Sequence, residues 1–111
     1  MKILVVEDEP DLAKFLELFL RAHRHEVWTF RDGATALRVL SEIAPDVLLC
    51  DLGVPGSDGE QVAAAAAGLP CHPRIVLMSG QPDRLERAGV FAAARLHKPF
   101  AIADLKRAIG G

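Results

Sequence analysis

Five short runs of mainly apolar residues are separated by segments with helical character, and this alternation limits the folds that are open to the chain. The runs are 3–6, 27–30, 47–50, 75–78 and 94–97. Strands that are apolar at nearly every position are typical of a parallel sheet that helices cover on both faces. Because strands that alternate with helices are joined by right-handed crossovers, we expect a doubly wound α/β fold with five parallel strands.

The segments between the runs predict five helices. In the first segment, apolar residues recur at helical spacing and indicate a stripe that faces the core. These residues are Leu12, Phe15, Leu16, Phe19 and Leu20. We expect the other helices at about 33–43, between Gly59 and Gly68, at 82–88 and at 101–109. In the last helix, Ile102, Leu105 and Ile109 share one face.

Length and charge restrict the class of protein. The 111 residues suit a single domain, 1–111, and 13 basic against 15 acidic residues give a net charge of -2. This balance predicts no direct binding of nucleic acid by the chain, because no basic stripe forms. The longest apolar runs are too short to span a membrane, so we expect a cytoplasmic protein. Cys50 and Cys71 are too far apart for a zinc motif and are expected to be structural thiols.

Polar residues follow four of the five predicted strands. Glu7 and Asp8 end the first, Asp51 the third, Ser79 the fourth and Lys98 the fifth. Each alone has an ordinary structural explanation, such as a helix cap, a turn residue or a solvated charge. Ligands of open α/β sheets, however, bind at the carboxyl ends of the strands. The coincidence of the four positions therefore predicts a site at this edge.

The same segments resemble the receiver domain of two-component response regulators. VVEDEP is similar to the acidic pair of that family, DVLLCDLGVPGSDG to its phosphoacceptor strand and loop, MSG to its hydroxyl position, and HKPF to its lysine segment. The resemblance extends over residues 2–109. It implies a flavodoxin-like sheet with strand order 2-1-3-4-5, and it implies that helices cover both faces.

The resemblance also implies a Mg²⁺ site, which explains why three acids follow one another at Glu7, Asp8 and Glu9. Oxygen ligands suit Mg²⁺, and the cation relieves the repulsion between the carboxylates. By similarity, Asp8 and Asp51 bind the ion directly, Gly53 contributes its backbone carbonyl, and Glu7 acts mainly through water. Glu9 has no family role and is assigned to the N-terminus of the following helix.

The chemistry implied is attack of Asp51 on a phosphoryl group, with a histidine kinase or a histidine phosphotransfer protein as donor. Lys98 would stabilise the phosphoryl oxygens, and Ser79 would bind the installed group and shift the following loop. Gly53 and Gln81 would flank the path of the hydrolytic water and set the lifetime of the phosphorylated state. The downstream target or output domain, the oligomeric state, and whether the chain acts alone or within a longer regulator all stay open.

Several positions depart from the family pattern. Arg95 occupies the place of a switch aromatic residue, and Phe91 is aromatic but at the wrong spacing. The segment from Ser79 to Lys98 is short, which predicts a stunted fourth helix. Arg24 stands where a glycine is common, so we expect the first helix to end without a left-handed cap. His97 should point away from Lys98 and have a structural or surface role.

Two other functions compete with that of a phosphoacceptor. A small Asp-nucleophile phosphohydrolase resembling the haloacid dehalogenase family needs a second acid two residues after the nucleophile, where this chain has Gly53. An interaction module that is independent of phosphorylation would be favoured if an acid, the acceptor or the lysine were missing. The chain has the acids, the acceptor and the lysine, so this alternative is disfavoured.

On the first helix, Leu18 is expected to be partly buried, either as a docking residue for the kinase or as a peripheral core residue.

Overall fold

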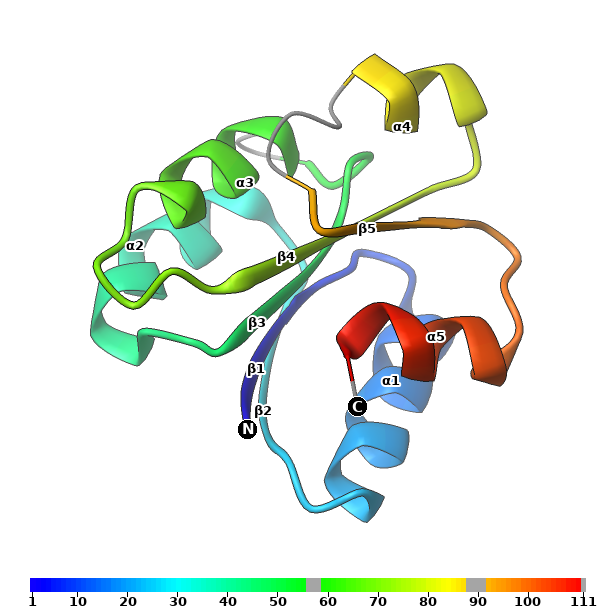
Figure 1. Cartoon of the computed structure of the whole chain (residues 1–111), viewed down its shortest axis with the longest axis horizontal. Coiled ribbons are helices and arrows are strands. Elements are labelled where there is room, and N and C mark those ends of the chain that lie inside the picture. The colour runs from blue at the N-terminus through cyan, green and yellow to red at the C-terminus, as the bar shows by residue number, and fades with distance from the viewer. Residues whose placement is uncertain (56–58, 88–91, 111) are drawn as a thin grey trace.

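The computed structural model of the chain describes residues 1–55, 59–87 and 92–110. Its five strands form one parallel sheet in the order β2-β1-β3-β4-β5, which confirms the predicted fold (Figure 1). The strands are β1 (Lys2–Val6), β2 (Glu26–Phe30), β3 (Val47–Asp51), β4 (Arg74–Ser79) and β5 (Ala94–His97). The helices are α1 (Pro10–Ala22), α2 (Gly33–Ile43), α3 (Gly59–Ala67), α4 (Pro82–Arg87) and α5 (Ile102–Ile109).

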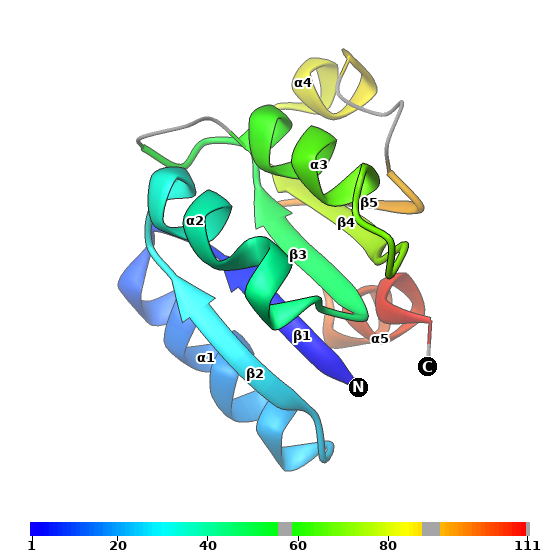
Figure 2. The same cartoon turned by 90° about the vertical axis from the view of Figure 1, so that its left-hand side faces the viewer.

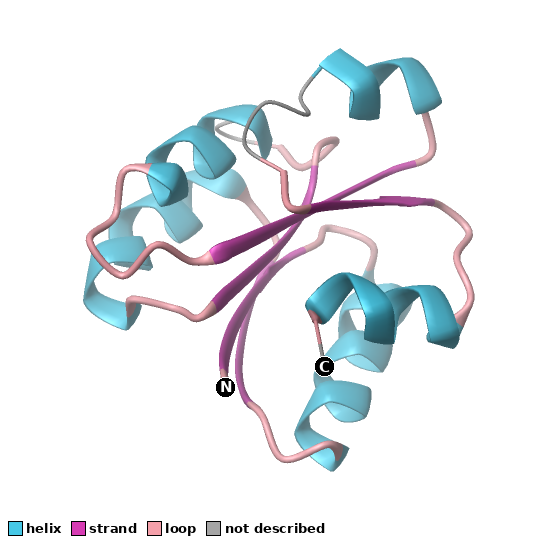
Figure 3. Cartoon of the chain, viewed as in Figure 1, coloured by secondary structure: helices cyan, strands magenta, loops and turns pink. Residues whose placement is uncertain are grey.

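Helices cover both faces of the sheet, as Figures 2 and 3 show. Successive strand residues point to opposite faces, so β1 sends Leu4 and Val6 into one core and Ile3 and Val5 into the other. The first core is closed by α2, α3 and α4, and the second by α1 and α5. This double burial explains why the central strands are apolar at nearly every position. None of the helices in the described residues is both long and apolar enough to cross a membrane.

The ends of α1 are fixed by local hydrogen bonds. At the N-terminus, the Glu9 carboxylate accepts the backbone N–H groups of Asp11 and Leu12, at 3.1 and 2.6 Å. Glu9 is therefore the N-cap, in agreement with its assignment to this helix.

The prediction for the C-terminus of α1 is wrong. Arg24 has φ +69°, so the helix does end in a left-handed residue although that residue is not glycine. The Arg24 N–H donates to Arg21 O at 3.0 Å and the His25 N–H to Leu20 O at 3.2 Å, the pair of bonds that defines a Schellman motif. These bonds satisfy helix carbonyls, which offsets the steric cost of the left-handed conformation for a side chain with a Cβ.

Burial differs from the predicted stripes at two positions. Leu16 and Leu20 are buried as expected, but the Phe15 side chain is 41 % exposed and stacks on Phe19, with ring centroids 5.7 Å apart. Ala13 is buried as well, three residues before Leu16 and therefore on the same face of α1. On α5, Leu105 and Ile109 are buried but Ile102 is 47 % exposed, because it is the first residue of the helix.

The segment between β4 and β5 is short, and the described part of α4 has six residues, Pro82–Arg87. The predicted end of this helix at Ala88 and the aromatic residue Phe91 lie outside the described residues. Arg95 on β5 donates a hydrogen bond from Nε to the Leu85 carbonyl at 3.2 Å. The residue that replaces the expected aromatic side chain therefore joins the edge strand to α4.

Candidate functional site

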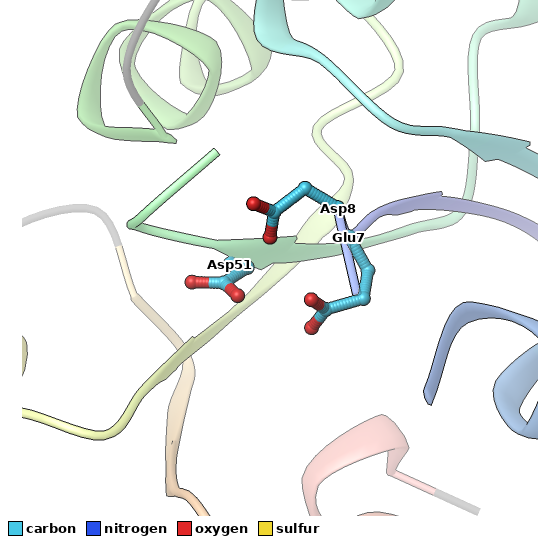
Figure 4. Close-up of side chains that lie close together, drawn as sticks. All are labelled: Glu7, Asp8 and Asp51. Carbon is cyan, nitrogen blue, oxygen red and sulfur yellow. The ribbon is translucent and has the colours of Figure 1, made fainter. Parts of the chain in front are cut away.

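The carboxyl ends of β1 and β3 bring three acidic side chains together, as Figure 4 shows. Glu7 and Asp8 follow β1, and Asp51 is the last residue of β3. One carboxylate oxygen from each residue lies within 4.8 Å of the others. Glu7 is fully buried and Asp51 is 7 % exposed, whereas Asp8 is exposed. The cluster is thus open to solvent on the Asp8 side and closed toward the sheet.

Lys98, directly after β5, contacts two of the three acids. Its Nζ lies 2.6 Å from Glu7 Oε1 and 2.5 Å from Asp51 Oδ2. The parallel order of the sheet makes this possible, because β5 lies two strands from β3 and its carboxyl end points to the same edge. A buried carboxylate without a cation is costly, so this bridge compensates part of the negative charge at the site.

Burial and hydrogen bonding shift the pKa values of the bridge. Burial raises the pKa of Glu7 from 4.5 to about 6, although the hydrogen bond from Lys98 acts in the opposite direction. The Glu9 N–H also donates to Glu7 Oε2, at 3.0 Å. For Lys98, burial alone would lower the pKa, but the hydrogen bonds to Asp51 and Glu7 raise it above its usual value. Lys98 is therefore a permanent cation at neutral pH.

Backbone groups orient the side chains of Asp51 and Ser79. The Gly53 N–H donates to Asp51 Oδ1 at 2.7 Å, so each carboxylate oxygen of Asp51 accepts one hydrogen bond. Ser79, 5 % exposed at the end of β4, accepts the Gln81 N–H through Oγ at 3.0 Å. The Gln81 side chain is exposed. The Ser79 hydroxyl can still donate one hydrogen bond, because its Oγ is used here as an acceptor.

The donor set fits a magnesium ion. Three carboxylates supply only oxygen ligands, which Mg²⁺ prefers, and the exposed Asp8 leaves room for the waters that the ion retains. The absence of sulfur and imidazole from this cluster disfavours zinc and copper. The residues that would hold the ion are the three acids of the cluster, Glu7, Asp8 and Asp51.

One residue of the site was not identified by sequence reasoning. Gly59, the first residue of α3, packs so closely on β3 that a Cβ atom would lie 2.5 Å from the Asp51 carbonyl oxygen and 2.7 Å from Leu52 Cα. Only glycine fits there without a shift of the acceptor backbone. The signal in the sequence was a glycine at the start of an alanine-rich helix. Most residue types form a helix better than glycine, so its presence there indicates a close contact. His97 is exposed, in agreement with a surface role.

Comparisons with known proteins agree on one family. Residues 3–110 match the family described as response regulator receiver domain. The transcriptional regulatory protein PrrA of Mycobacterium leprae is 36% identical over 107 residues, which cover 94% of this chain and 46% of that protein. Protein-glutamate methylesterase/protein-glutamine glutaminase 5 of Myxococcus xanthus is 37% identical over 109 residues, covering 93% of this chain and 31% of that protein. The chain thus spans less than half the length of these relatives.

The fold has a similar solved counterpart. The response regulator protein TrrA of Thermotoga maritima, in complex with Mg²⁺ and BeF, superimposes with a TM-score of 0.84 at 27% identity. The match covers 96% of this chain and 93% of that one.

Proposed function

Because the chain belongs to the response regulator receiver domains, we propose that it carries a signal as a phosphoryl group on Asp51, transferred from a histidine kinase or a histidine phosphotransfer protein. The observation that carries this proposal is the Asp51 carboxylate, which is nearly buried at the end of β3 and held by Lys98 Nζ and the Gly53 N–H. Two hydrogen bonds fix the orientation of a nucleophile that has one lone pair left on each oxygen.

The reaction forms a bond between an Asp51 carboxylate oxygen and phosphorus, while the bond from phosphorus to the donor nitrogen or oxygen breaks and its electron pair leaves with the donor. Lys98 Nζ lies 2.5 Å from Asp51 Oδ2, so it is within reach of phosphoryl oxygens attached to Asp51. Its positive charge would stabilise the negative charge on those oxygens. The chain thereby promotes its own phosphorylation and dephosphorylation but acts on no other substrate.

Receiver domains generally bind Mg²⁺ at an acidic pocket, and Glu7, Asp8 and Asp51 form such a cluster here. We assign Asp8, Asp51 and the backbone carbonyl of Gly53 as ligands, and Glu7 as a residue that acts through water. When bound, Mg²⁺ neutralises charge on the transferring phosphoryl group. Asp8 is the exposed member of the cluster, so it is the acid that an incoming ion meets first.

Ser79 is proposed to report phosphorylation to the rest of the molecule. Its hydroxyl would donate to a phosphoryl oxygen, which moves the Ser79–Gln81 segment toward Asp51 and with it the start of α4. Arg95 ties β5 to α4 through Leu85, so a displacement of α4 would act on the edge strand. The arginine contact takes the place of the aromatic switch residue of the family.

The proposed function is that of a single receiver domain, residues 1–111. The curated relatives are more than twice as long as this chain. The proposed function therefore does not include the output that the domain controls. We propose that the domain acts in the cytoplasm, as response regulators typically do. Gly53 argues against the haloacid dehalogenase type of phosphohydrolase, because its backbone N–H and not a second acid faces the acceptor.

The test is the intact mass of the protein after incubation with acetyl phosphate, with Mg²⁺ and with a chelator. We expect one phosphoryl group per chain with Mg²⁺ and little without it. Asp8→Ala should reduce the apparent Mg²⁺ affinity more than Glu7→Gln, because only Asp8 is assigned as a direct ligand. Equal losses in the two variants would refute this ligand assignment, and a phosphorylated Asp51→Ala variant would refute the acceptor.

A further inference from the structure

Every polar group of Glu9 takes part in a hydrogen bond. Its carboxylate accepts the N–H groups of Asp11 and Leu12, at 3.1 and 2.6 Å. Its backbone carbonyl accepts the Ala13 N–H at 2.9 Å, which is the first hydrogen bond of α1. Its own N–H donates to Glu7 Oε2 at 3.0 Å. Glu9 is exposed, so it is held by these bonds and not by burial, and it joins the start of α1 to a buried acid of the site.

The orientation of Glu7 depends on two hydrogen bonds, one to each carboxylate oxygen. Lys98 Nζ lies 2.6 Å from Oε1, and the Glu9 N–H donates to Oε2 at 3.0 Å. Because Glu7 is fully buried, an oxygen that lost its donor would have no solvent to replace it. The backbone of Glu9 therefore supplies one of the two bonds that orient this carboxylate.

The backbone that carries Asp8 is held on both sides. Before it, the Glu7 N–H donates to the Phe30 carbonyl on β2 at 2.9 Å, and after it the bonds of Glu9 fix the chain. Among the described residues, no hydrogen bond or ion pair holds the Asp8 carboxylate itself, so its direction follows from the backbone. Figure 4 shows this carboxylate beside Asp51. A change in the backbone at Glu9 would therefore move Asp8.

Glutamate is not among the preferred N-cap residues, which are short polar ones such as Asn, Asp and Ser. Here the Glu9 backbone is extended, with φ -79° and ψ 117°, and each carboxylate oxygen accepts one N–H group of the first turn. Loss of an N-cap loosens the first turn of a helix. Because Glu9 also donates the N–H that binds Glu7, a loosened turn would release both acids of the pair from their arrangement.

We propose that Glu9 is a positioning residue of the metal site, which caps α1 and thereby holds Glu7 and Asp8 in the arrangement that binds Mg²⁺. The inference rests on the proposed function, because it concerns the ion that this function requires. If the ion binds only the held arrangement, its apparent dissociation constant rises as the held fraction falls. The competing explanation is that the exposed Glu9 carboxylate attracts the cation through its charge alone.

The first measurement is Mg²⁺ affinity by isothermal titration calorimetry at about 0.15 M ionic strength, where exposed charges are screened. Glu9→Ala removes the cap and the charge, Glu9→Ser keeps a cap without the charge, and Glu9→Asp keeps both. We expect Glu9→Ala to raise the dissociation constant about fivefold, and the other two variants to stay within about twofold of the wild type. Asp32→Ala is the matched control, because it removes the cap of α2 and one negative charge. It should bind Mg²⁺ like the wild type.

The second measurement is hydrogen exchange of the residue 9 amide in the metal-free protein, which a purely electrostatic role would leave unchanged. Because this amide donates to Glu7 Oε2, its protection reports whether the turn is held. We expect protection to fall about fivefold in Glu9→Ala and to be retained in Glu9→Ser and Asp32→Ala. At saturating Mg²⁺, Glu9→Ala should reach the wild-type rate of phosphorylation by acetyl phosphate, since the proposed role ends once the ion is bound.

Equal loss of Mg²⁺ affinity in Glu9→Ser and Glu9→Ala would overturn the proposal, because the charge alone would then explain the effect. Unchanged amide protection in Glu9→Ala would also overturn it, as would a phosphorylation defect that persists at saturating Mg²⁺. The proposed function fails separately from this inference. A wild type that binds no Mg²⁺ would refute the metal site itself, whereas wild-type affinity in Glu9→Ala would refute only the role of Glu9.

Discussion

The buried carboxyl group of Glu7 should make the metal-free protein less stable as the pH rises. Its pKa is about 6 in the folded protein against 4.5 for the ordinary group, because burial disfavours the charged form. Between these two values the folded chain binds more protons than the unfolded chain, so the free energy of unfolding falls with increasing pH. The stabilising contribution is complete below pH 4.5 and is lost above about pH 6.

The expected size follows from the shift in pKa. Each pKa unit corresponds to about 1.4 kcal/mol, so the loss amounts to about 2 kcal/mol of unfolding free energy. Glu7→Gln removes the titration while keeping nearly the same side-chain size. The difference in unfolding free energy between wild type and Glu7→Gln should therefore decrease by about 2 kcal/mol across this pH range.

The assay is urea denaturation in a chelating buffer at several pH values from below 4.5 to above 6. The proposed site would bind Mg²⁺ in its ionised form, whereas the unfolded chain would not, so the ion should restore stability at neutral pH, by about 2.7 kcal/mol at 100 times its dissociation constant. A difference between the two proteins that is constant or rises with pH would refute the effect of burial on Glu7. Failure of Mg²⁺ to stabilise the wild type would refute the metal site.

Three further changes test other parts of the molecule. Arg24→Gly should raise the free energy of unfolding by about 0.5–1 kcal/mol, because φ is +69° there, and a loss of stability in urea would contradict the Schellman cap. Gly53→Arg and Gln81→Leu should both slow decay of the phosphorylated protein after donor removal. At position 53, a Cβ would lie 3.4 Å from Asp51 Oδ1, so a larger side chain would obstruct the hydrolytic water. Unchanged decay in both variants would mean that other residues control access of this water. Leu18→Ala should slow transfer from a phosphodonor protein but not from acetyl phosphate, because Leu18 is 57 % exposed; equal slowing of both would exclude docking.

The strand pattern was predictable because each central strand is buried on two faces and can tolerate few polar residues. The start of α2 was also predictable, and the helix begins at Gly33 as expected. Asp32 caps it by accepting the Thr35 N–H at 2.7 Å. Periodicity failed for Phe15 and Ile102, which are both exposed, because it gives the direction of a stripe but not how much of it the neighbouring elements cover.

The sequence predicts which side chains lie at the site, because these residues follow the carboxyl ends of parallel strands. Parallel strands deliver Glu7, Asp51 and Lys98 to one edge, and that follows from the order of elements alone. The bridge of Lys98 to both acids and the close approach of Gly59 were not predictable, because they depend on how the loops return across the edge. The left-handed Arg24 was missed because the chain reversal after α1 imposes it against the preference of the residue.

Locating the phosphoryl group on the chain shows whether Asp51 is the phosphoacceptor. Borohydride reduces an aspartyl phosphate to homoserine, so peptide mass spectrometry after phosphorylation and reduction identifies the acceptor residue. We expect homoserine at position 51, formed with Mg²⁺ and absent when Asp51→Asn is treated in the same way. Asp83→Asn, which changes an exposed acid on α4, is the control and should react like the wild type. A modified residue at any other position, or an adduct that survives hydroxylamine, would contradict the assignment of Asp51 as the phosphoacceptor.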